Sequence, residues 1–327
     1  MIEEILKKRV LVLDGAMGTM VQRYKLSEDD FRGEQFKNHS CDLKGNNDLL
    51  SLTQPEAIFN IHKQYLDAGA DIIETNTFSS TSIAMADYGM ESLVYELNYE
   101  SAKLAKKATK KFNNETNKPR FVAGSIGPTN KTASMSPDVN NPGYREINFD
   151  DLVNSYTEQI AALIDGGVDI LLVETVFDTL NAKAALFAIE NYKKKNLLDI
   201  PVMVSGTITD ASGRTLSGQT LEAFVTSISH INLLSIGLNC ALGAEQLYPY
   251  IKKLSMITDL NISVHPNAGL PNEFGEYDQD PEQMQNLIRD YLKNSLVNII
   301  GGCCGTTPDH IRLIAEIAND YSIRKTN

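Results

Sequence analysis

Asn298-Ile-Ile-Gly-Gly-Cys-Cys-Gly-Thr-Thr307 is an apolar run that stops at a group of glycines and two adjacent cysteines. Neighbouring side chains of an extended strand point to opposite faces, so Cys303 and Cys304 can reach one ion only where the strand breaks into a turn. The flanking glycines permit that break because they tolerate positive φ and close backbone approach. The next residues, Thr306-Thr-Pro-Asp-His310, have the signals of a helix start: a threonine cap, a proline in the first turn and an acid near the positive end of the dipole. The stretch therefore predicts a strand-to-helix junction, where the catalytic groups of α/β proteins gather.

The same order of helix, glycine, short apolar strand and polar end recurs along the chain. Strand candidates lie at residues 10–14, 70–76, 121–126, 168–174, 201–206, 233–239, 261–266 and 297–301. Helical segments separate most of them, for example at residues 92–109, 178–195, 219–228, 244–255 and 281–293. Such alternation predicts a (β/α)8 TIM barrel, an α/β fold, as a single domain over residues 1–327. A doubly wound open sheet is the alternative, but the first strand is not followed by a clear Gly-x-Gly-x-x-Gly fingerprint.

In a barrel, the polar residues that close the strands share one rim, and barrel active sites lie on that face. The residues expected there are Asp14, residues 74–77, Ser125, Glu174, residues 205–209, Asn239, Cys240, residues 265–267, Cys303 and Cys304. Two long polar loops, at residues 128–148 and 208–220, belong to the same rim. We interpret them as lids, as a docking surface for a large partner, or as ordinary solvated loops.

Composition narrows the class of protein. The 327 residues carry 30 basic and 42 acidic side chains, and a net charge of -12 disfavours binding to nucleic acid or to an anionic membrane. No window approaches 18 consecutive apolar residues, and the charged amphipathic start over residues 1–8 does not resemble a signal peptide. We therefore expect a cytoplasmic protein without a membrane segment. Four cysteines without secretory context favour thiol or metal chemistry over disulfides.

Three cysteines form a candidate metal site. Cys240 closes the sixth predicted strand and Cys303 with Cys304 closes the eighth, so in a closed barrel the three thiolates can converge on one ion. Soft thiolates select zinc, and three protein ligands leave the fourth tetrahedral position open for catalysis. The alternative is three small, buried cysteines without metal. Cys41 lies in an irregular loop without partner spacing, and we expect it to be structural.

Two acids at strand ends form a candidate amino-acid site. Asp14 and Glu174 close the first and fourth strands, and between them they could hold a substrate ammonium group, while the N–H groups of the turn at Gly15 could donate hydrogen bonds to a substrate carboxylate. Thr75, on the same rim, is predicted as a further substrate contact. The alternative is that each acid caps the helix that follows it. The five histidines form no zinc-protease motif, and only His265 falls on the rim.

Gly237-Leu-Asn-Cys-Ala-Leu-Gly243 together with Gly301-Gly-Cys-Cys-Gly305 resembles the homocysteine S-methyltransferase family, and the likeness covers nearly the whole chain. Several longer stretches resemble more closely the homocysteine-binding, amino-terminal module of cobalamin-dependent methionine synthase. They are Leu13-Asp-Gly-Ala-Met-Gly-Thr-Met20, Cys41-Asp-Leu-Lys-Gly-Asn-Asn-Asp48, Glu74-Thr-Asn-Thr-Phe78, Gly127-Pro-Thr-Asn130, Glu174-Thr-Val-Phe-Asp-Thr-Leu-Asn181, residues 205–218 and His265-Pro-Asn-Ala-Gly-Leu-Pro-Asn272.

The resemblance implies a zinc-dependent barrel that methylates L-homocysteine to methionine. It implies that Cys240, Cys303 and Cys304 bind the zinc ion, that Asp14 and Glu174 contact the amino acid's polar end, and that Asn267 fills the fourth zinc position without substrate. It also implies methylcobalamin as the donor, on a separate corrinoid-binding domain or protein, with a folate-binding partner. The alternatives are direct use of S-methylmethionine, S-adenosylmethionine or betaine, or a non-catalytic zinc-binding barrel. The full synthase continues into further modules, so this chain is either an excised module or a stand-alone protein.

Overall fold

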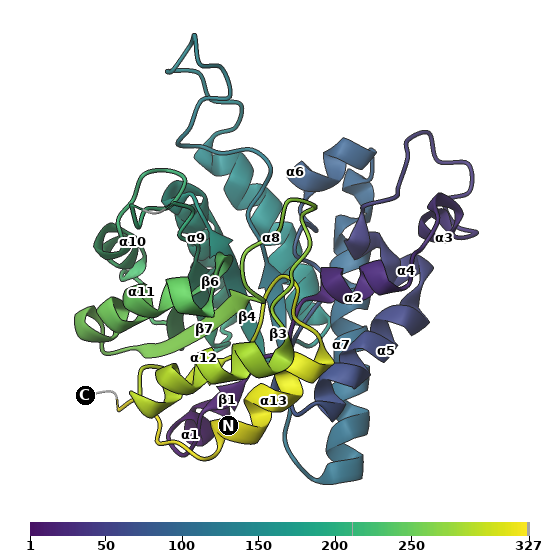
Figure 1. Ribbon diagram of the computed structural model, residues 1–327. Coiled ribbons are helices and arrows are strands. Elements are labelled where there is room, and N and C mark those ends of the chain that lie inside the picture. Colours follow the sequence, from purple (N-terminus) through teal and green to yellow (C-terminus); the bar gives the residue numbers. More distant parts are fainter. Residues whose placement is uncertain (211, 326–327) are drawn as a thin grey trace.

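A computed structural model describes residues 1–210 and 212–325 and confirms the (β/α)8 barrel (Figure 1). Within these residues, eight parallel strands form one sheet in the order β1-β8-β7-β6-β5-β4-β3-β2. An isolated parallel bridge between Leu13 and Ile72 joins the β1 and β2 edges, so the open-sheet alternative is wrong. The strands are β1 (Leu11–Val12), β2 (Ile72–Glu74), β3 (Phe121–Ile126), β4 (Ile170–Val176), β5 (Val202–Gly206), β6 (Ser235–Gly243), β7 (Asn261–Asn267) and β8 (Ile299–Ile300).

Helices surround this sheet and bury their apolar sides against it (Figure 1). The main outer helices are α5 (Pro55–Asp67), α7 (Val94–Thr116), α8 (Phe149–Asp165), α9 (Thr179–Asn196), α10 (Leu221–Ile228), α11 (Ala244–Ile257), α12 (Pro281–Lys293) and α13 (Pro308–Ala318). The shorter ones are α1 (Ile2–Leu6), α2 (Met17–Arg23), α3 (Glu28–Arg32), η1 (Asn47–Leu49), α4 (Leu50–Thr53), α6 (Ser82–Met85), η2 (Ala86–Tyr88) and η3 (Glu91–Leu93). Among the described residues, no helix has the length and apolar character that crossing a bilayer requires.

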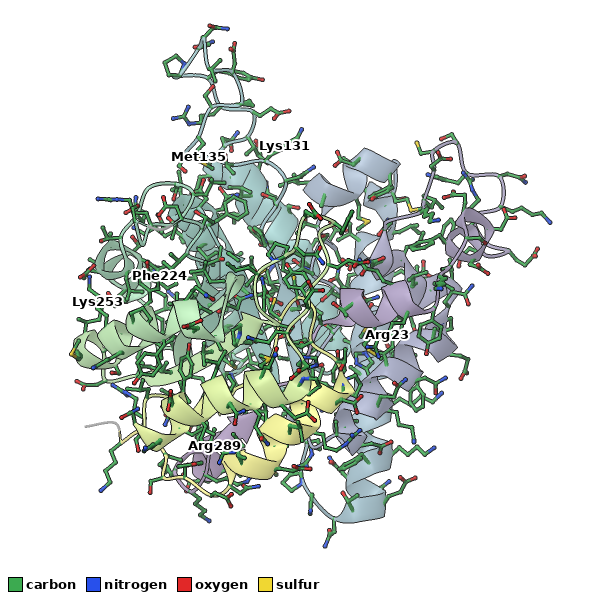
Figure 2. All side chains as sticks on the ribbon, in the orientation of Figure 1. Arg23, Lys131, Met135, Phe224, Lys253 and Arg289 are labelled. Atoms are coloured by element: carbon green, nitrogen blue, oxygen red, sulfur yellow. The ribbon has the colours of Figure 1, made fainter. Side chains whose placement is uncertain are left out.

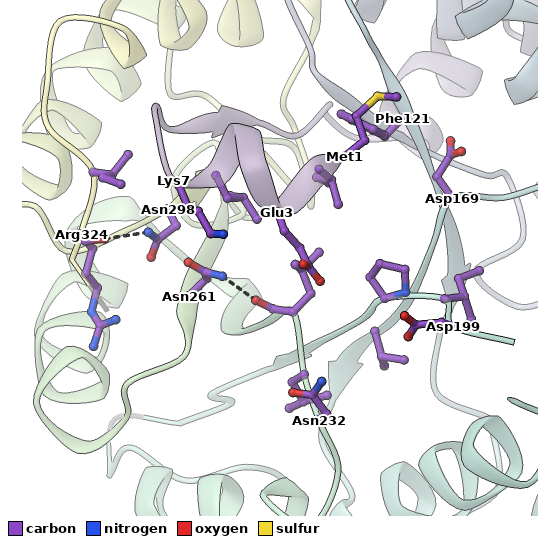
Figure 3. Close-up of a pocket in the computed structure, with 18 of the residues that line it drawn as sticks. Met1, Glu3, Lys7, Phe121, Asp169, Asp199, Asn232, Asn261, Asn298 and Arg324 are labelled. Atoms are coloured by element: carbon purple, nitrogen blue, oxygen red, sulfur yellow. Dashed lines mark hydrogen bonds between the residues drawn. The ribbon is translucent and has the colours of Figure 1, made fainter. Parts of the chain in front are cut away.

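Alternate residues of the strands fill the inside of the barrel, as the two-residue repeat of a strand requires. Leu11, Leu13, Ile170 and Leu172 belong to this inner cluster, and Ile2 and Leu6 of α1 pack against the same cluster from below. Helix α1 therefore closes the end of the barrel at which the strands begin. A cleft of about 770 Å³ surrounds α1 on this face (Figure 3). The amides of Asn261 and Asn298 there already donate to the Leu234 and Arg324 carbonyls.

The outer helices start where their capping residues predict. The predicted threonine cap of α13 is Thr307, which forms a reciprocal capping box with His310. Asn148 with Asp151 and Asp280 with Gln283 form similar boxes at α8 and α12. These caps fix where each loop on the carboxyl-end rim turns into its helix.

The structure differs from the expected boundaries at several elements. The first and last strands are shorter than predicted. A Cβ at Gly301 would lie 2.7 Å from Leu13 Cβ, so the two backbones approach closely there. The predicted glycine turn after Asp14 ends early, since α2 already begins at Met17. Helix α7 runs past the predicted residue 109 to Thr116, and its C-cap residue Asn117 has φ +57°.

The segment between β3 and α8 projects from the barrel beyond the carboxyl ends of the strands (Figure 1). Lys131 and Met135 lie on this segment (Figure 2). Lys131 Nζ lies 3.3 Å from the Glu146 carboxylate, which ties the two halves of the segment together. The segment corresponds to the first of the two rim loops predicted from the sequence.

Candidate active site

A cavity of about 960 Å³ opens at the carboxyl ends of the strands, on the face that the sequence predicts. Seven of the eight predicted site residues line it: Asp14, Gly15, Thr75, Glu174, Cys240, Cys303 and Cys304. Asn267 lies behind the cavity wall, fully buried at the end of β7. The structure therefore brings the predicted thiols and acids together in one cavity.

The three predicted cysteines converge. Cys240 Sγ lies 3.7 Å from Cys304 Sγ, and the three Sγ atoms of Cys240, Cys303 and Cys304 lie within 4.8 Å of one another. A disulfide would need about 2.05 Å. Two thiolates of a tetrahedral zinc site lie about 3.8 Å apart, given a Zn–S distance of about 2.3 Å. The donor set and its spacing thus fit a zinc ion, whereas Cys41 is exposed and lies outside the group.

Breaks in two strands aim these thiols at one point. Cys240 and Ala241 have φ of +58° and +56°, an uncommon conformation for residues with a side chain, and the β6–β7 register shifts there. After β8, the Cys303 N–H donates to the Pro266 carbonyl (2.8 Å) and the Cys304 carbonyl accepts from Ala268 N–H (2.9 Å). The predicted turn is therefore present, and it lets two adjacent cysteines face the same cavity.

Sequence reasoning missed Tyr277, which lies in the loop after β7. The pKa of Cys304 falls well below its ordinary value because Cys240 and Cys303 donate hydrogen bonds to its thiolate, and the Tyr277 hydroxyl adds another. A Cβ at Gly305 would collide with Tyr277, so the glycine allows the tyrosine to approach the thiols. Nothing in the local sequence marks Tyr277, because its position depends on how the loop folds back.

The two predicted acids are almost fully buried, Asp14 with 3% and Glu174 with 4% of its surface exposed. Asp14 Oδ2 accepts from the Glu74 N–H (3.1 Å), while its Oδ1 is buried without a partner among the described residues. Glu174 Oε1 accepts from Ser125 Oγ (2.5 Å). Neither acid caps a helix, since α2 has no side-chain cap and Asp178 caps α9. The helix-cap alternative is therefore wrong for both.

Glu74 adds a third carboxyl group to Asp14 and Glu174, and the imidazole of His265 lies beside this acid cluster. Sequence reasoning did not single out Glu74 or His265 as site residues. The ligand atoms of Glu74, Glu174 and His265 lie within 4.8 Å of one another, close enough to surround one cation, whether metal or ammonium. Burial raises the pKa of Glu174 to about 7 and lowers that of His265 to about 3. The available signal was that both residues close predicted strands on the same rim as Asp14.

The remaining predicted contacts differ in what they offer. Within the described residues the Gly15 N–H has no acceptor, and a Cβ there would collide with Thr306 and Tyr65. The Thr75 hydroxyl accepts from the Ser125 N–H (3.0 Å) and contacts the Thr77 hydroxyl (2.6 Å), so it supports β3. Asn267 Oδ1 is buried without a partner. Gly15 and Asn267 therefore have unpaired polar atoms, whereas the Thr75 hydroxyl is already engaged.

A side-chain clamp joins β4 to β6 beside the thiols. Asn239 accepts from the Thr175 N–H (3.0 Å) and donates to Thr175 Oγ1 (2.8 Å). Its amide also lies 3.9 Å from Cys303 Sγ. Thr175 has φ +53°, a strained conformation for a β-branched residue, and the clamp compensates for that strain.

The chain is similar to known proteins over most of its length. A family model described as homocysteine S-methyltransferase matches residues 11–318. The homocysteine methyltransferase MmuM from Escherichia coli, metallated form, is 24% identical with a TM-score of 0.73, covering 96% of this chain and 98% of that chain. Its oxidized form is 23% identical with a TM-score of 0.74, covering 95% and 97%. An amine oxidase from Pseudomonas geniculata is 10% identical with a TM-score of 0.54, covering 97% and 50%. At these identities the solved structures show a shared fold.

Proposed function

Because the chain belongs to the homocysteine S-methyltransferase family, we propose that it transfers a methyl group to the sulfur of L-homocysteine and forms methionine. One observation carries the proposal: a thiol cluster and a cluster of buried acids line the same cavity on the catalytic face of the barrel. The thiols suit the sulfur end of the substrate. The acids suit its ammonium end.

Cys240, Cys303 and Cys304 are the residues proposed to hold a zinc ion, because their sulfur spacing and softness fit that metal. When bound, zinc would take up the homocysteine sulfur and lower its thiol pKa, so that the thiolate exists near neutral pH. The unpaired Oδ1 of Asn267 supports the expectation that this residue fills the fourth position without substrate. Tyr277 and Asn239 support the cysteine sulfurs by hydrogen bonding.

Asp14 and Glu174 are proposed to bind the substrate ammonium group. Both carboxyls are buried, and charge-assisted hydrogen bonds are strong in such surroundings. The free N–H of Gly15 is proposed to bind the substrate carboxylate. Thr75 is proposed to contribute by shaping the wall next to Glu74, since its hydroxyl is already engaged. Held at both polar groups, the substrate would present its sulfur toward the cavity mouth.

The proposed reaction is an in-line displacement at the methyl carbon. The new sulfur–methyl bond forms as the donor–methyl bond breaks, its electron pair stays with the donor, and the thiol proton leaves to solvent. We propose methylcobalamin on a separate corrinoid-binding domain or protein as donor, with a folate-binding partner to remethylate it. The synthase-like stretches support this choice.

The test is spectroscopic. Zinc-loaded protein is mixed with homocysteine and free methylcobalamin, the visible spectrum is followed and methionine is measured. We expect the methylcobalamin bands to disappear while methionine forms, and the bands to persist when homocysteine is omitted.

An unchanged spectrum, with one equivalent of zinc bound, would contradict the corrinoid donor. The same protein is then assayed with S-methylmethionine, S-adenosylmethionine and betaine, and methionine from any of them would assign a small donor. No methionine from all four donors would favour the non-catalytic zinc-binding barrel.

A further inference from the structure

Glu74 is the third carboxyl group of the acid cluster. It closes β2 and lines the cavity together with Asp14, which follows β1, and Glu174 of β4. Its backbone N–H donates to Asp14 Oδ2, and one of its carboxyl oxygens lies within 4.8 Å of a carboxyl oxygen of Glu174. Three acids from three strands therefore meet at one point beneath the cavity mouth.

This cluster has an excess of potential negative charge. No described lysine or arginine pairs with Asp14, Glu74 or Glu174, and the imidazole of His265 beside them has an unpaired Nε2. Two ionised carboxylates in contact within a poorly solvated site repel strongly. One substrate ammonium group can offset part of three charges but not all of them. A hydrogen bond between two carboxyls also requires one of them to hold a proton.

The hydrogen-bond partners of the three carboxyl groups indicate which of them holds a proton. Glu174 accepts the Ser125 hydroxyl at 2.5 Å and Asp14 accepts a backbone N–H, and both bonds favour the ionised form. Among the described residues, no hydroxyl, amide or backbone N–H donates to the Glu74 carboxyl. Burial raises the pKa of Glu74 well above its ordinary value, and the charges of Glu174 and Asp14 raise it further. Burial also raises the pKa values of Asp14 and Glu174, but Glu74 is the acid for which none of the named surroundings favours the ionised form.

We propose that Glu74 is a positioning residue that stays protonated and donates a hydrogen bond to Glu174, so that the Glu174 carboxylate faces the ammonium group of the substrate. The inference rests on the proposed function, since it needs an ammonium-bearing thiol as substrate. It adds a specificity: the cluster selects α-amino thiols, and Glu74 acts on their recognition through Glu174 alone.

The experiment compares two variants of Glu74 on two substrates. Glu74→Gln keeps the shape and supplies an amide N–H in place of the carboxylic O–H, whereas Glu74→Leu removes the donor. The substrates are homocysteine and 4-mercaptobutanoate, which has the same thiol and carboxylate but no amino group. We expect Glu74→Gln to keep KM for homocysteine within about threefold of wild type. Glu74→Leu should raise it roughly 10- to 100-fold, as expected for loss of a hydrogen bond to a charged group.

Neither variant should change the KM for 4-mercaptobutanoate, because that substrate does not use Glu174. If Glu74 had a merely structural role, its replacement would raise the KM for both substrates alike. If Glu74→Gln is as impaired as Glu74→Leu on homocysteine, Glu74 acts as an anion and the proposal is overturned. A second equivalent of metal that is lost in Glu74→Gln would also overturn it, because the cluster would then be a metal site.

Infrared spectroscopy keeps the proposal testable if Glu74→Leu does not fold. The wild-type spectrum should contain the carbonyl band of a buried protonated carboxyl group, and Glu74→Gln should lack it. An unchanged band would place the proton elsewhere. If wild-type protein binds no homocysteine at all, the proposed function fails instead, and the band in the substrate-free protein still locates the proton.

Discussion

Among the described residues, Cys240, Cys303 and Cys304 are the cysteines whose sulfurs lie close enough together to hold a metal ion. We predict that Cys304→Ser lowers zinc content from about one equivalent to nearly none and abolishes methionine formation, because a hydroxyl is a poor ligand for zinc beside two thiolates. Metal analysis after dialysis and a methyl-transfer assay measure the two effects. Cys41→Ser is the matched control, since Cys41 is exposed and outside the group. Turnover by a metal-free Cys304→Ser protein would contradict the role.

The Asn239 side chain is a second feature at this scale. Asn239→Ala removes both bonds of the clamp and leaves the strained Thr175 without its partners. We predict a loss of roughly 2–4 kcal/mol in the free energy of unfolding, and a drop of about 10- to 100-fold in zinc affinity because the amide also contacts Cys303. Urea unfolding and competition with a chelator measure these values.

Asn294→Ala is the control for Asn239→Ala, because Asn294 donates its hydrogen bonds at the exposed end of α12. Its stability and zinc affinity should match wild type. Equal zinc affinity in both variants would show that the clamp supports the strands and not the thiols.

Among the elements, α5 carries a buried histidine that makes stability depend on pH. His62 is fully buried, neither ring nitrogen has a partner, and burial lowers its pKa to about 4. The unfolded chain binds a proton near pH 6.5, so this contribution to stability is complete above that pH and is lost as the pH falls toward 4. The loss amounts to about 3 kcal/mol.

We predict that His62→Leu removes this dependence and is at least as stable as wild type at pH 7. Urea unfolding of both proteins at pH 7 and pH 4.5 provides the comparison. Parallel losses in the two proteins would show that His62 does not titrate on unfolding in this range.

The sequence predicted the order of the elements well, for a local reason. Each repeat carries its own signals, such as Pro55 at the first position of α5 and Gly69 before β2, and those signals need no distant contact. The thiols and the acids Asp14 and Glu174 were predicted because barrel geometry places strand ends on one rim. The contact between Glu74 and Glu174, 100 residues apart in sequence, depends on strand register and barrel closure. Tyr277 depends on a loop path, and neither feature has a local signal.

At the scale of the molecule, the two ends of the barrel differ. The candidate active site opens at the carboxyl ends of the strands, whereas α1 closes the end at which the strands begin. Leu6 is 2% exposed and fills the sealed end within the inner cluster. We predict that Leu6→Ala costs roughly 2–4 kcal/mol of unfolding free energy, while the KM for homocysteine is unchanged because the site lies at the opposite end. Lys8→Ala, on the exposed residue just beyond α1, should change neither quantity. A shifted KM in Leu6→Ala would show that the two ends are coupled.

The depth of the acids relative to the thiols imposes an order of events on the proposed reaction. Asp14 and Glu174 are almost fully buried, whereas Cys240, Cys303 and Cys304 are partly exposed toward the mouth. If these acids hold the ammonium group as proposed, the amino acid enters head first, and a donor that reaches the sulfur from the mouth lies behind it. The proposed reaction would then have a fixed order, in which homocysteine binds first, the demethylated donor departs next and methionine leaves last. In kinetic terms, the depth of the acids predicts a compulsory-order mechanism.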